Sequence, residues 1–294
     1  MGLSVKHSTK YPPLNDFAKS IFALAIFLFV TQIQNVAPAY AIGYRSEEDF
    51  RVAKHGQQFL NSGKLQDAIE YLNQSIAQKP QSAELHYELG NAYLRAREFT
   101  RAIESYQQAV RLRNPFPEAT LNAAYACMDA GMELQAIPWF HKYLRENPKV
   151  PQAKEVEAEL LCAHAKAQMK EKRNFDAKQT LERALQIAPT SQLVLFSLAR
   201  ARSELGDTKG AISAYEALLK LNPKHSAAVL NMAECYQTSG QLPEAVTWLK
   251  RYANANPTSP DTEEVRRMIV ALTEKSNEKR SDPQALDYTD SISK

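Results

Sequence analysis

One helical-hairpin pattern of about 34 residues recurs six times between Val52 and Pro257. Each copy carries a small residue in its first helix, an alanine and a large residue in its second helix, and a closing proline. The second copy shows the pattern most clearly, with Leu89, Gly90, Tyr93, Ala102, Tyr106, Ala109 and Pro115. A hairpin of this length cannot bury its own apolar face, so neighbouring copies must stack. The pattern therefore predicts an all-α fold, an α–α superhelix of six helical hairpins.

The small residue of the first helix lets the paired helix approach closely, and a larger residue there would overpack the contact at roughly 1–3 kcal/mol. The six copies place Gly56, Gly90, Ala124, Ala165, Ala199 and Ala233 at this position. In four copies a glycine follows the first helix, which predicts a helix C-cap with positive φ at Gly63, Gly131, Gly206 and Gly240. Arg97 and Lys172 hold the same position in the other two copies, so we expect strained or differently shaped turns there.

The closing prolines follow one another at intervals of 35, 33, 41, 34 and 34 residues. The interval of 41 marks an insertion at residues 149–157, which we expect to lengthen the first helix of the fourth copy and to form a hinge. Pro243 suits the first turn of its helix, whereas Pro138 lies deeper, so we expect the start of that helix to shift.

These positions make the chain resemble the tetratricopeptide repeat (TPR) family, over about residues 49–257. The resemblance implies a solenoid of six hairpins in which the first helix of each hairpin lines a concave, ligand-binding face. Ser259, Pro260 and Asp261 then signal the start of an amphipathic helix that would cap the solenoid. We predict a signal peptide at 1–41, a lead-in at 42–48, repeats 1–3 at 49–148, the insertion at 149–157, repeats 4–6 at 158–257, the capping helix at 258–275 and a disordered tail at 276–294.

The first 41 residues have the layout of a secretory signal. Three lysines precede an apolar run, and Ala39-Tyr40-Ala41 offers a small-x-small cleavage site. We expect cleavage after Ala41, or alternatively after Ala39, and export to a periplasm or the exterior. The alternative is a retained membrane anchor at residues 17–33, which is the sole membrane contact that the sequence predicts.

Composition and motifs argue against several functions. Removal of residues 1–41 lowers the formal net charge from +3 to +1, which disfavours a nucleic-acid partner. The sequence has no phosphate loop, nucleophile elbow or zinc-ligand spacing. We therefore predict no enzymatic activity, no catalytic residue, no cofactor, no metal site and no small-molecule substrate. The spacing of the three cysteines predicts free thiols without a disulfide.

The geometry of TPR proteins, carried over to this sequence, predicts a peptide-binding groove. Its residues would be Tyr87, Asn91, Leu121, Asn122, Tyr125, Met128, Lys166, Met169, Lys170, Phe196 and Arg200. We expect the apolar members to anchor a peptide or helix, the two asparagines to hold its backbone, and the cations to take an acidic side chain or a carboxylate. Asn91 and Asn122 match the asparagines of a known carboxylate clamp, but its cationic positions hold Ala53, Glu159 and Ala163, which disfavours that clamp.

The sequence thus predicts a non-catalytic scaffold that holds a partner polypeptide, with assembly of an envelope or surface complex as the role that the resemblance implies. Two alternatives stay open. The chain is a self-associating module, a homo-oligomer whose groove takes its own tail or another copy, or it is an accessory subunit of an exported enzyme.

Overall fold

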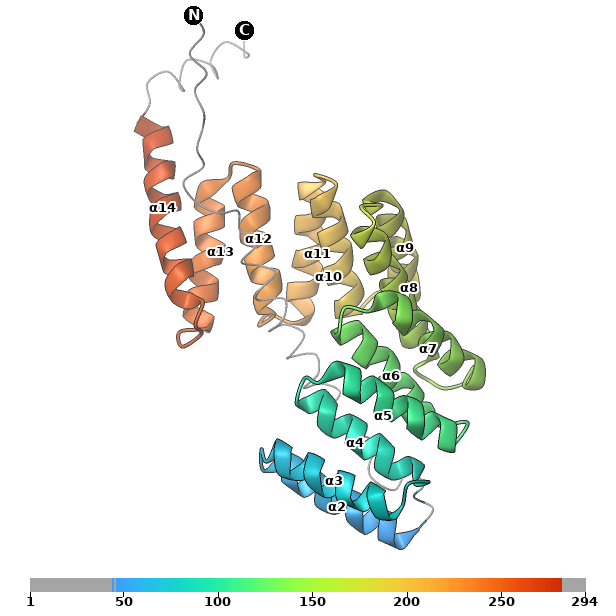
Figure 1. Cartoon of the computed structure of the whole chain (residues 1–294). Helices are drawn as coiled ribbons and strands as arrows, with labels where there is room; N and C mark the ends of the chain where they lie inside the picture. The colour runs from blue at the N-terminus through green and yellow to red at the C-terminus, as the bar shows by residue number, and fades with distance from the viewer. Residues whose placement is uncertain (1–43, 45, 282–294) are drawn as a thin grey trace, which may run out of the picture. The chain divides into compact units, whose positions relative to one another are not determined.

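The computed structural model describes residue 44 and residues 46–281. Within this part, the chain forms thirteen α-helices and no strand (Figure 1). Twelve of them follow one another as first and second helices of six pairs, and the thirteenth comes after the last pair. They are α2 (Glu47–Asn61), α3 (Leu65–Gln78), α4 (Ala83–Arg95), α5 (Phe99–Leu112), α6 (Pro117–Asp129), α7 (Glu133–Glu146), α8 (Ala153–Lys170), α9 (Asn174–Ile187), α10 (Gln192–Glu204), α11 (Thr208–Leu221), α12 (Ser226–Thr238), α13 (Leu242–Ala255) and α14 (Thr262–Ser281).

Prolines and left-handed turns set these bounds. Every second helix has 14 residues and ends two or three residues before a closing proline, because proline disfavours helical backbone in the residue before it. All six turns between paired helices have one residue with φ between 60° and 77°. The predicted glycine C-caps are therefore confirmed.

The turns at Arg97 and Lys172 have the same shape as the glycine turns. In the turn after α4, the Arg97 N–H donates to the Leu94 carbonyl and the Glu98 N–H donates to the Tyr93 carbonyl, which is the Schellman pattern. Arg97 has φ 61° and Lys172 has φ 60°. Of the two outcomes expected for these turns, the structure therefore shows strain without a change of shape.

Pro138 does not shift the start of its helix, contrary to expectation. Helix α7 begins at Glu133, two residues after Gly131, just as α3 begins two residues after Gly63. Pro138 lies inside the helix and is exposed. The carbonyl that its missing N–H leaves without a helical donor belongs to Leu134, which is 68% exposed and accessible to water.

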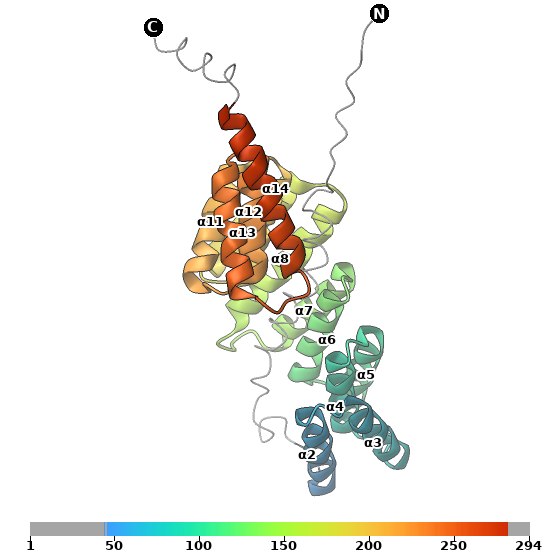
Figure 2. The same cartoon turned by 90° about the vertical axis from the view of Figure 1, so that its left-hand side faces the viewer.

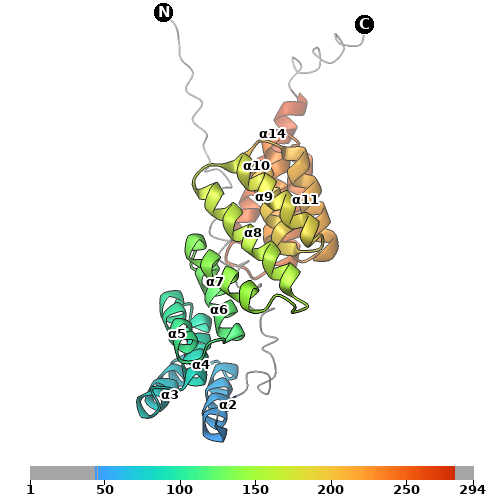
Figure 3. The same ribbon diagram turned by 90° about the vertical axis from the view of Figure 1, so that its right-hand side faces the viewer.

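The described residues divide into two compact units, with the boundary between Ser197 and Leu198 inside α10. In the N-terminal unit, α2 to α9 stack in chain order, each beside the next (Figures 1 and 3). Its core contains fully buried Tyr106, Phe116 and Phe140. In the C-terminal unit, α11 to α14 also pack in order (Figure 2), around the buried rings of Tyr215 and Tyr252.

The inserted residues lengthen α8, which has 18 residues where α4, α6, α10 and α12 each have 13. Val156 and Leu160 of this longer helix share a core with Phe140 and Tyr143 of α7. Val156 therefore anchors the insertion to the core of the N-terminal unit, while most other residues of 149–157 are exposed. The hinge expected there stays a prediction. Helix α14 runs to Ser281, beyond Lys275, where the capping helix was expected to end.

Candidate functional site

A series of hydrogen bonds joins the first helices α2, α4 and α6. The Gln57 side-chain amide lies 3.4 Å from both carboxylate oxygens of Glu88. Asn91 Nδ2 donates to Glu88 Oε2 at 3.2 Å, and Asn122 Nδ2 donates to Asn91 Oδ1 at 3.1 Å. The Tyr106 hydroxyl, from α5, donates to the same Asn91 oxygen at 2.8 Å. We call these five residues the polar ladder.

The polar ladder changes the expected role of the two asparagines. Both ends of the Asn91 amide are held by neighbouring side chains, and the Asn122 amide nitrogen faces Asn91 and the Tyr87 hydroxyl. Asn91 is half-buried, and an amide whose donor and acceptor are both used gains little from a new partner. Asn91 therefore holds helices together, and the expectation that it offers its amide to a peptide backbone is corrected.

Glu88 is the acidic centre of the ladder. It is 1% exposed, and burial raises the pKa of its carboxyl, while hydrogen bonds from Tyr44, Asn91 and Gln57 oppose that rise. Tyr44 precedes α2, and its hydroxyl donates to Glu88 Oε1 at 2.6 Å while its ring lies edge-on to Phe50. Sequence reasoning missed Tyr44 and Glu88. The available signal was an acidic residue beside Tyr87 in a first helix that is otherwise rich in apolar residues.

A second carboxylate, which is half-buried, lies further along the same series of helices. The Tyr125 hydroxyl, from α6, donates to Glu159 Oε2 of α8 at 2.7 Å. Burial raises the pKa of Glu159 to about 7, although the Tyr125 hydrogen bond lowers it. Among residues 46–281, no ion pair reaches Glu88 or Glu159. Two carboxylates therefore lie on the first helices with hydrogen bonds from neutral donors alone.

Two of the predicted aromatic anchors belong to the core. Tyr87 is 4% exposed, and its ring centroid lies 5.2 Å from that of Phe116 and 5.9 Å from that of Tyr106. Phe196 is 7% exposed. Both side chains are buried, so neither offers the open surface that was expected. This corrects their assignment as groove anchors.

The other apolar groove residues keep part of their surface accessible. Leu121, Tyr125 and Met128 are half-buried and pack against the core that α6, α7 and α8 share. Met169, near the end of α8, is also half-buried. These four residues were predicted for the groove and are accessible to a partner, and Glu159, which was not predicted for it, is hydrogen-bonded to Tyr125. We call these five residues the α6–α8 surface.

The three predicted cations differ in their surroundings. Lys170 Nζ donates to the Gly131 carbonyl and to Glu133 Oε2, so its charge is already compensated. Lys166 lowers the pKa of the neighbouring Asp129 carboxyl, which burial raises to about 6. Arg200 belongs to the C-terminal unit, where burial raises the pKa of Glu234 and the nearby Arg200 opposes that rise. The Lys170 side chain is 58% exposed, and the expectation that it takes an acidic ligand stays a prediction.

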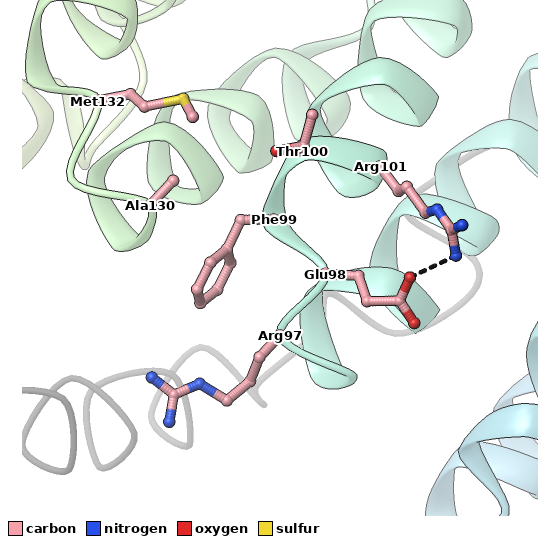
Figure 4. A pocket seen from close by; sticks show the side chains of 7 residues that line it. All are labelled: Arg97, Glu98, Phe99, Thr100, Arg101, Ala130 and Met132. Carbon is pink, nitrogen blue, oxygen red and sulfur yellow. Dashed lines mark hydrogen bonds and ion pairs between the residues drawn. The ribbon is translucent and has the colours of Figure 1, made fainter.

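A separate cavity of about 420 Å³ lies at the turns between helices, and none of the predicted groove residues lines it (Figure 4). It is lined by Arg97, Glu98, Phe99, Thr100, Arg101, Ala130 and Met132. Arg101 pairs with Glu98 at 2.6 Å, and the Arg97 guanidinium lies 5.9 Å from the centre of the Phe99 ring. We call this the turn cavity. Its one sequence signal was an arginine where other copies have glycine.

Other sites can be assessed for the described residues alone. All three cysteines are buried and free, as expected. Burial raises the pKa of Cys127, Cys162 and Cys235 to about 11, 12 and 11. Across residues 46–281, no three histidine, cysteine or acidic side chains gather as metal ligands would. None of the helices between Glu47 and Ser281 combines the length and apolar character needed to span a bilayer.

Comparisons with known proteins identify relatives of this fold. The chain is similar to the human protein O-mannosyl-transferase TMTC3, with 24% identity over 217 residues. The match covers 69% of this chain but 23% of that protein, so the chain spans about a quarter of the length of its curated relative. The type IV pilus biogenesis factor PilW has a similar structure, with a TM-score of 0.60 and 15% identity over 75% of this chain and 99% of PilW. A TPR protein from Parabacteroides merdae gives a TM-score of 0.59 at 12% identity, over 87% of this chain and 95% of its own.

Family models of the tetratricopeptide repeat match residues 54–151 and 202–269, together more than half of the chain. These ranges contain all four glycine turns as well as the turn at Arg97. The lengthened α8 and its partner α9 lie between the two ranges. The stacked helix pairs, the left-handed turns and the closing prolines agree with these matches, and the chain belongs to the tetratricopeptide repeat family.

Proposed function

We propose that this chain is a non-catalytic scaffold that holds a partner polypeptide on the α6–α8 surface. TPR proteins bind peptides and proteins, and this fold supplies the surface on its first helices. The observation that carries the proposal is the Tyr125–Glu159 pair. It places a carboxylate without a cation beside half-buried apolar side chains.

The chemistry of this surface favours a basic partner segment. A carboxylate in a poorly solvated position interacts more strongly with a cation than it would in water. Glu159, whose pKa burial raises to about 7, is stabilised as an anion when a lysine or arginine approaches it. Leu121, Met128 and Met169 offer apolar contacts beside it. The proposed ligand is therefore a peptide or helix with a basic residue flanked by apolar ones.

We further propose that the chain acts after export, in the assembly of an envelope or surface complex. This proposal rests on the sequence of residues 1–41, with its lysines, apolar run and Ala39-Tyr40-Ala41 site. Those residues lie outside the described part of the structure. The near-neutral charge of residues 42–294 supports a polypeptide partner over nucleic acid.

A pull-down with matched baits tests the binding proposal. The wild-type chain is compared with Glu159→Gln and Glu159→Lys, and Glu157→Lys serves as the control because Glu157 is exposed on the same helix. We expect a partner that wild type and the Glu157 variant retain and both Glu159 variants lose, with helical circular dichroism unchanged. Equal capture by all four baits would place the binding site elsewhere.

The protein that both Glu159 variants fail to capture can then be used to test the chemistry of binding. A basic segment of that partner, made as a peptide, should bind the wild-type chain more weakly as ionic strength rises, because salt screens charge pairs that are partly exposed. Binding that is insensitive to salt would contradict the role of Glu159 while leaving the TPR fold untouched.

Cleavage after Ala41 or Ala39 is read by N-terminal sequencing of the exported protein, and an intact N-terminus would favour the anchor at residues 17–33.

A further inference from the structure

The buried carboxylate of Glu88 takes its shortest hydrogen bond from a residue outside the helices. The Tyr44 hydroxyl donates to Glu88 Oε1 at 2.6 Å. Asn91 Nδ2 lies 3.2 Å from Oε2, and the Gln57 amide lies 3.4 Å from both oxygens. Burial raises the pKa of Glu88 and Arg95 opposes that rise, but no cation within residues 46–281 forms an ion pair with it. A carboxylate that is 1% exposed therefore depends on Tyr44 for its best donor.

The surroundings of Tyr44 fit its ring as well as its hydroxyl. The ring lies edge-on to Phe50 of α2, with the centroids 5.6 Å apart, and it packs against the core that contains Tyr87 and Phe116. Burial raises the pKa of the Tyr44 phenol well above its usual range, so the hydroxyl keeps its proton and donates. Apolar side chains thus contact the ring, and an acceptor lies at the hydroxyl. We call the residues that provide these contacts the phenol site: Phe50, Gln57, Glu88 and Asn91.

A buried carboxylate is a costly way to hold an aromatic ring. An apolar side chain at position 88 would contact the ring without the free energy that burying a charge requires. The carboxylate adds discrimination, because a ring without a hydroxyl leaves the buried acceptor without its best partner. The chemistry of Glu88 therefore selects a phenol, and among protein side chains the phenol belongs to tyrosine.

Tyr44 can leave the phenol site without unfolding a helix. It lies before α2, and α2 has an N-cap of its own, because the Ser46 hydroxyl accepts from the Asp49 N–H at 3.0 Å. Helix α2 packs on both α3 and α4, and the Gln57 amide joins it directly to Glu88. These contacts keep α2 in place when Tyr44 is absent. Tyr44 is thus an occupant of the site, whose frame is provided by α2 and α4.

We propose that the phenol site binds the tyrosine side chain of a partner polypeptide, and that Tyr44 fills the site in cis until that tyrosine displaces it. The exchange replaces one phenol–carboxylate hydrogen bond with another. Tyr44 therefore lowers the apparent affinity for the partner by the fraction of chains in which it fills the site. The phenol site shares no residue with the α6–α8 surface, so this proposal goes beyond the scaffold function and can fail independently of it.

A small molecule tests the recognition chemistry in the full-length chain. Tyr44→Ala leaves a void that an aromatic molecule can enter, and p-cresol is the tyrosine side chain cut at its Cβ atom. Toluene has the same ring and methyl group but no hydroxyl. Ligand-observed NMR titrations measure both Kd values. We expect the Kd of toluene to exceed that of p-cresol by about tenfold or more in Tyr44→Ala, and we expect no such preference in the wild-type chain, whose site is filled.

Two further variants separate recognition from nonspecific binding. Tyr71→Ala is the matched control, because Tyr71 is also half-buried and its ring contacts His55 and Phe59, while its hydroxyl bonds no carboxylate among the described residues. It should show no preference for p-cresol. Adding Glu88→Leu to Tyr44→Ala removes the acceptor and should make toluene bind at least as tightly as p-cresol. Circular dichroism checks that each variant keeps its helices.

A peptide tests whether Tyr44 competes with a tyrosine supplied in trans. The labelled peptide of residues 42–46, which contains Tyr44, should bind the Tyr44→Ala chain about tenfold or more tightly than wild type in fluorescence anisotropy. The same peptide with Tyr44→Phe should bind that variant about tenfold more weakly. Three results would each overturn the proposal: equal binding of p-cresol and toluene to Tyr44→Ala, the same preference in Tyr71→Ala, or a peptide that does not prefer the Tyr44→Ala chain.

Discussion

Replacing Gly90 with alanine should destabilise the second hairpin, because the Tyr106 ring of α5 leaves no room for a Cβ atom at Gly90 of α4. A Cβ atom at Gly90 would lie 2.6 Å from Tyr106 Cε1 and 2.7 Å from Tyr106 Cδ1. Carbon atoms pack favourably at about 3.5–4.0 Å, so the ring would have to move by about 1 Å. Tyr106 is fully buried, and its hydroxyl is held by Asn91, so the ring has little freedom to move.

The expected change in free energy combines three contributions. Overpacking a close-packed contact costs about 1–3 kcal/mol. Displacing the Tyr106 hydroxyl weakens a hydrogen bond worth about 0.5–1.5 kcal/mol. Alanine, however, favours a helix interior over glycine by about 0.8–1 kcal/mol. The net expectation for Gly90→Ala is therefore destabilisation by about 1–2 kcal/mol.

Gly56→Ala is the matched control, because Gly56 holds the same position in the first hairpin. Its added Cβ would lie 3.2 to 3.4 Å from side-chain atoms of Leu72, which can yield by a few tenths of an ångström. The gain in helix propensity, about 0.8–1 kcal/mol, then offsets the smaller packing cost. We expect Gly56→Ala to lie within about 0.5 kcal/mol of wild type.

Urea unfolding followed by circular dichroism measures the stability of both variants, and hydrogen exchange of the α4 and α5 amides localises the effect, because repeat arrays need not unfold in a single step. Faster exchange in α4 and α5 is expected for Gly90→Ala. A Gly90→Ala chain as stable as wild type, with unchanged exchange, would refute the reasoning. It would show that this hairpin widens as readily as the fifth copy, where the sequence places Ala199 opposite Tyr215.

Four further outcomes are expected. Burial raises the pKa of Glu159 to about 7 in the folded chain, against 4.5 in the unfolded chain. Between pH 4.5 and 7 the folded chain therefore binds more protons than the unfolded chain, so its stability falls as the pH rises through this range. Glu159→Gln removes this loss and should raise the melting temperature at pH 8 more than at pH 5. Arg97→Gly and Lys172→Gly should each stabilise the chain by up to about 1 kcal/mol in urea titrations, since glycine relieves the positive-φ strain. The three cysteines should resist a thiol reagent at pH 8 until denaturant is added, because burial raises their pKa values to about 11 or 12. Tyr125→Ala should weaken partner binding by about 1–3 kcal/mol in a titration while leaving helical circular dichroism intact.

The candidate site shows which properties of a residue can be predicted by aligning the repeats. Alignment placed Asn91, Asn122 and Tyr125 on first helices, where each takes part in bonds between neighbouring repeats. It also counted Tyr87 and Phe196 as accessible, and both are buried. Alignment supplies the position of a residue in its own hairpin. Accessibility depends as well on the neighbouring hairpin, whose side chains differ in size from copy to copy.

The sequence by itself determined the helix pairs, their turns and their ends. Proline, glycine and the helical period act through steric limits within a few residues of backbone. Their effects on helix ends and turns can therefore be predicted without knowledge of the rest of the chain. At Arg97 and Lys172 the position in the repeat left two outcomes open, a strained turn or a differently shaped one, and the positive φ values show the first.

Only the tertiary structure decided which side chains meet. Tyr44 reaches Glu88 across 44 residues of sequence, and Arg97 and Met132 share one cavity although they belong to different hairpins. These contacts depend on how one hairpin packs on the next. That packing is set by the combined volume of many interdigitated side chains. No local rule fixes that sum, and it is what turns a buried glutamate into a candidate binding group.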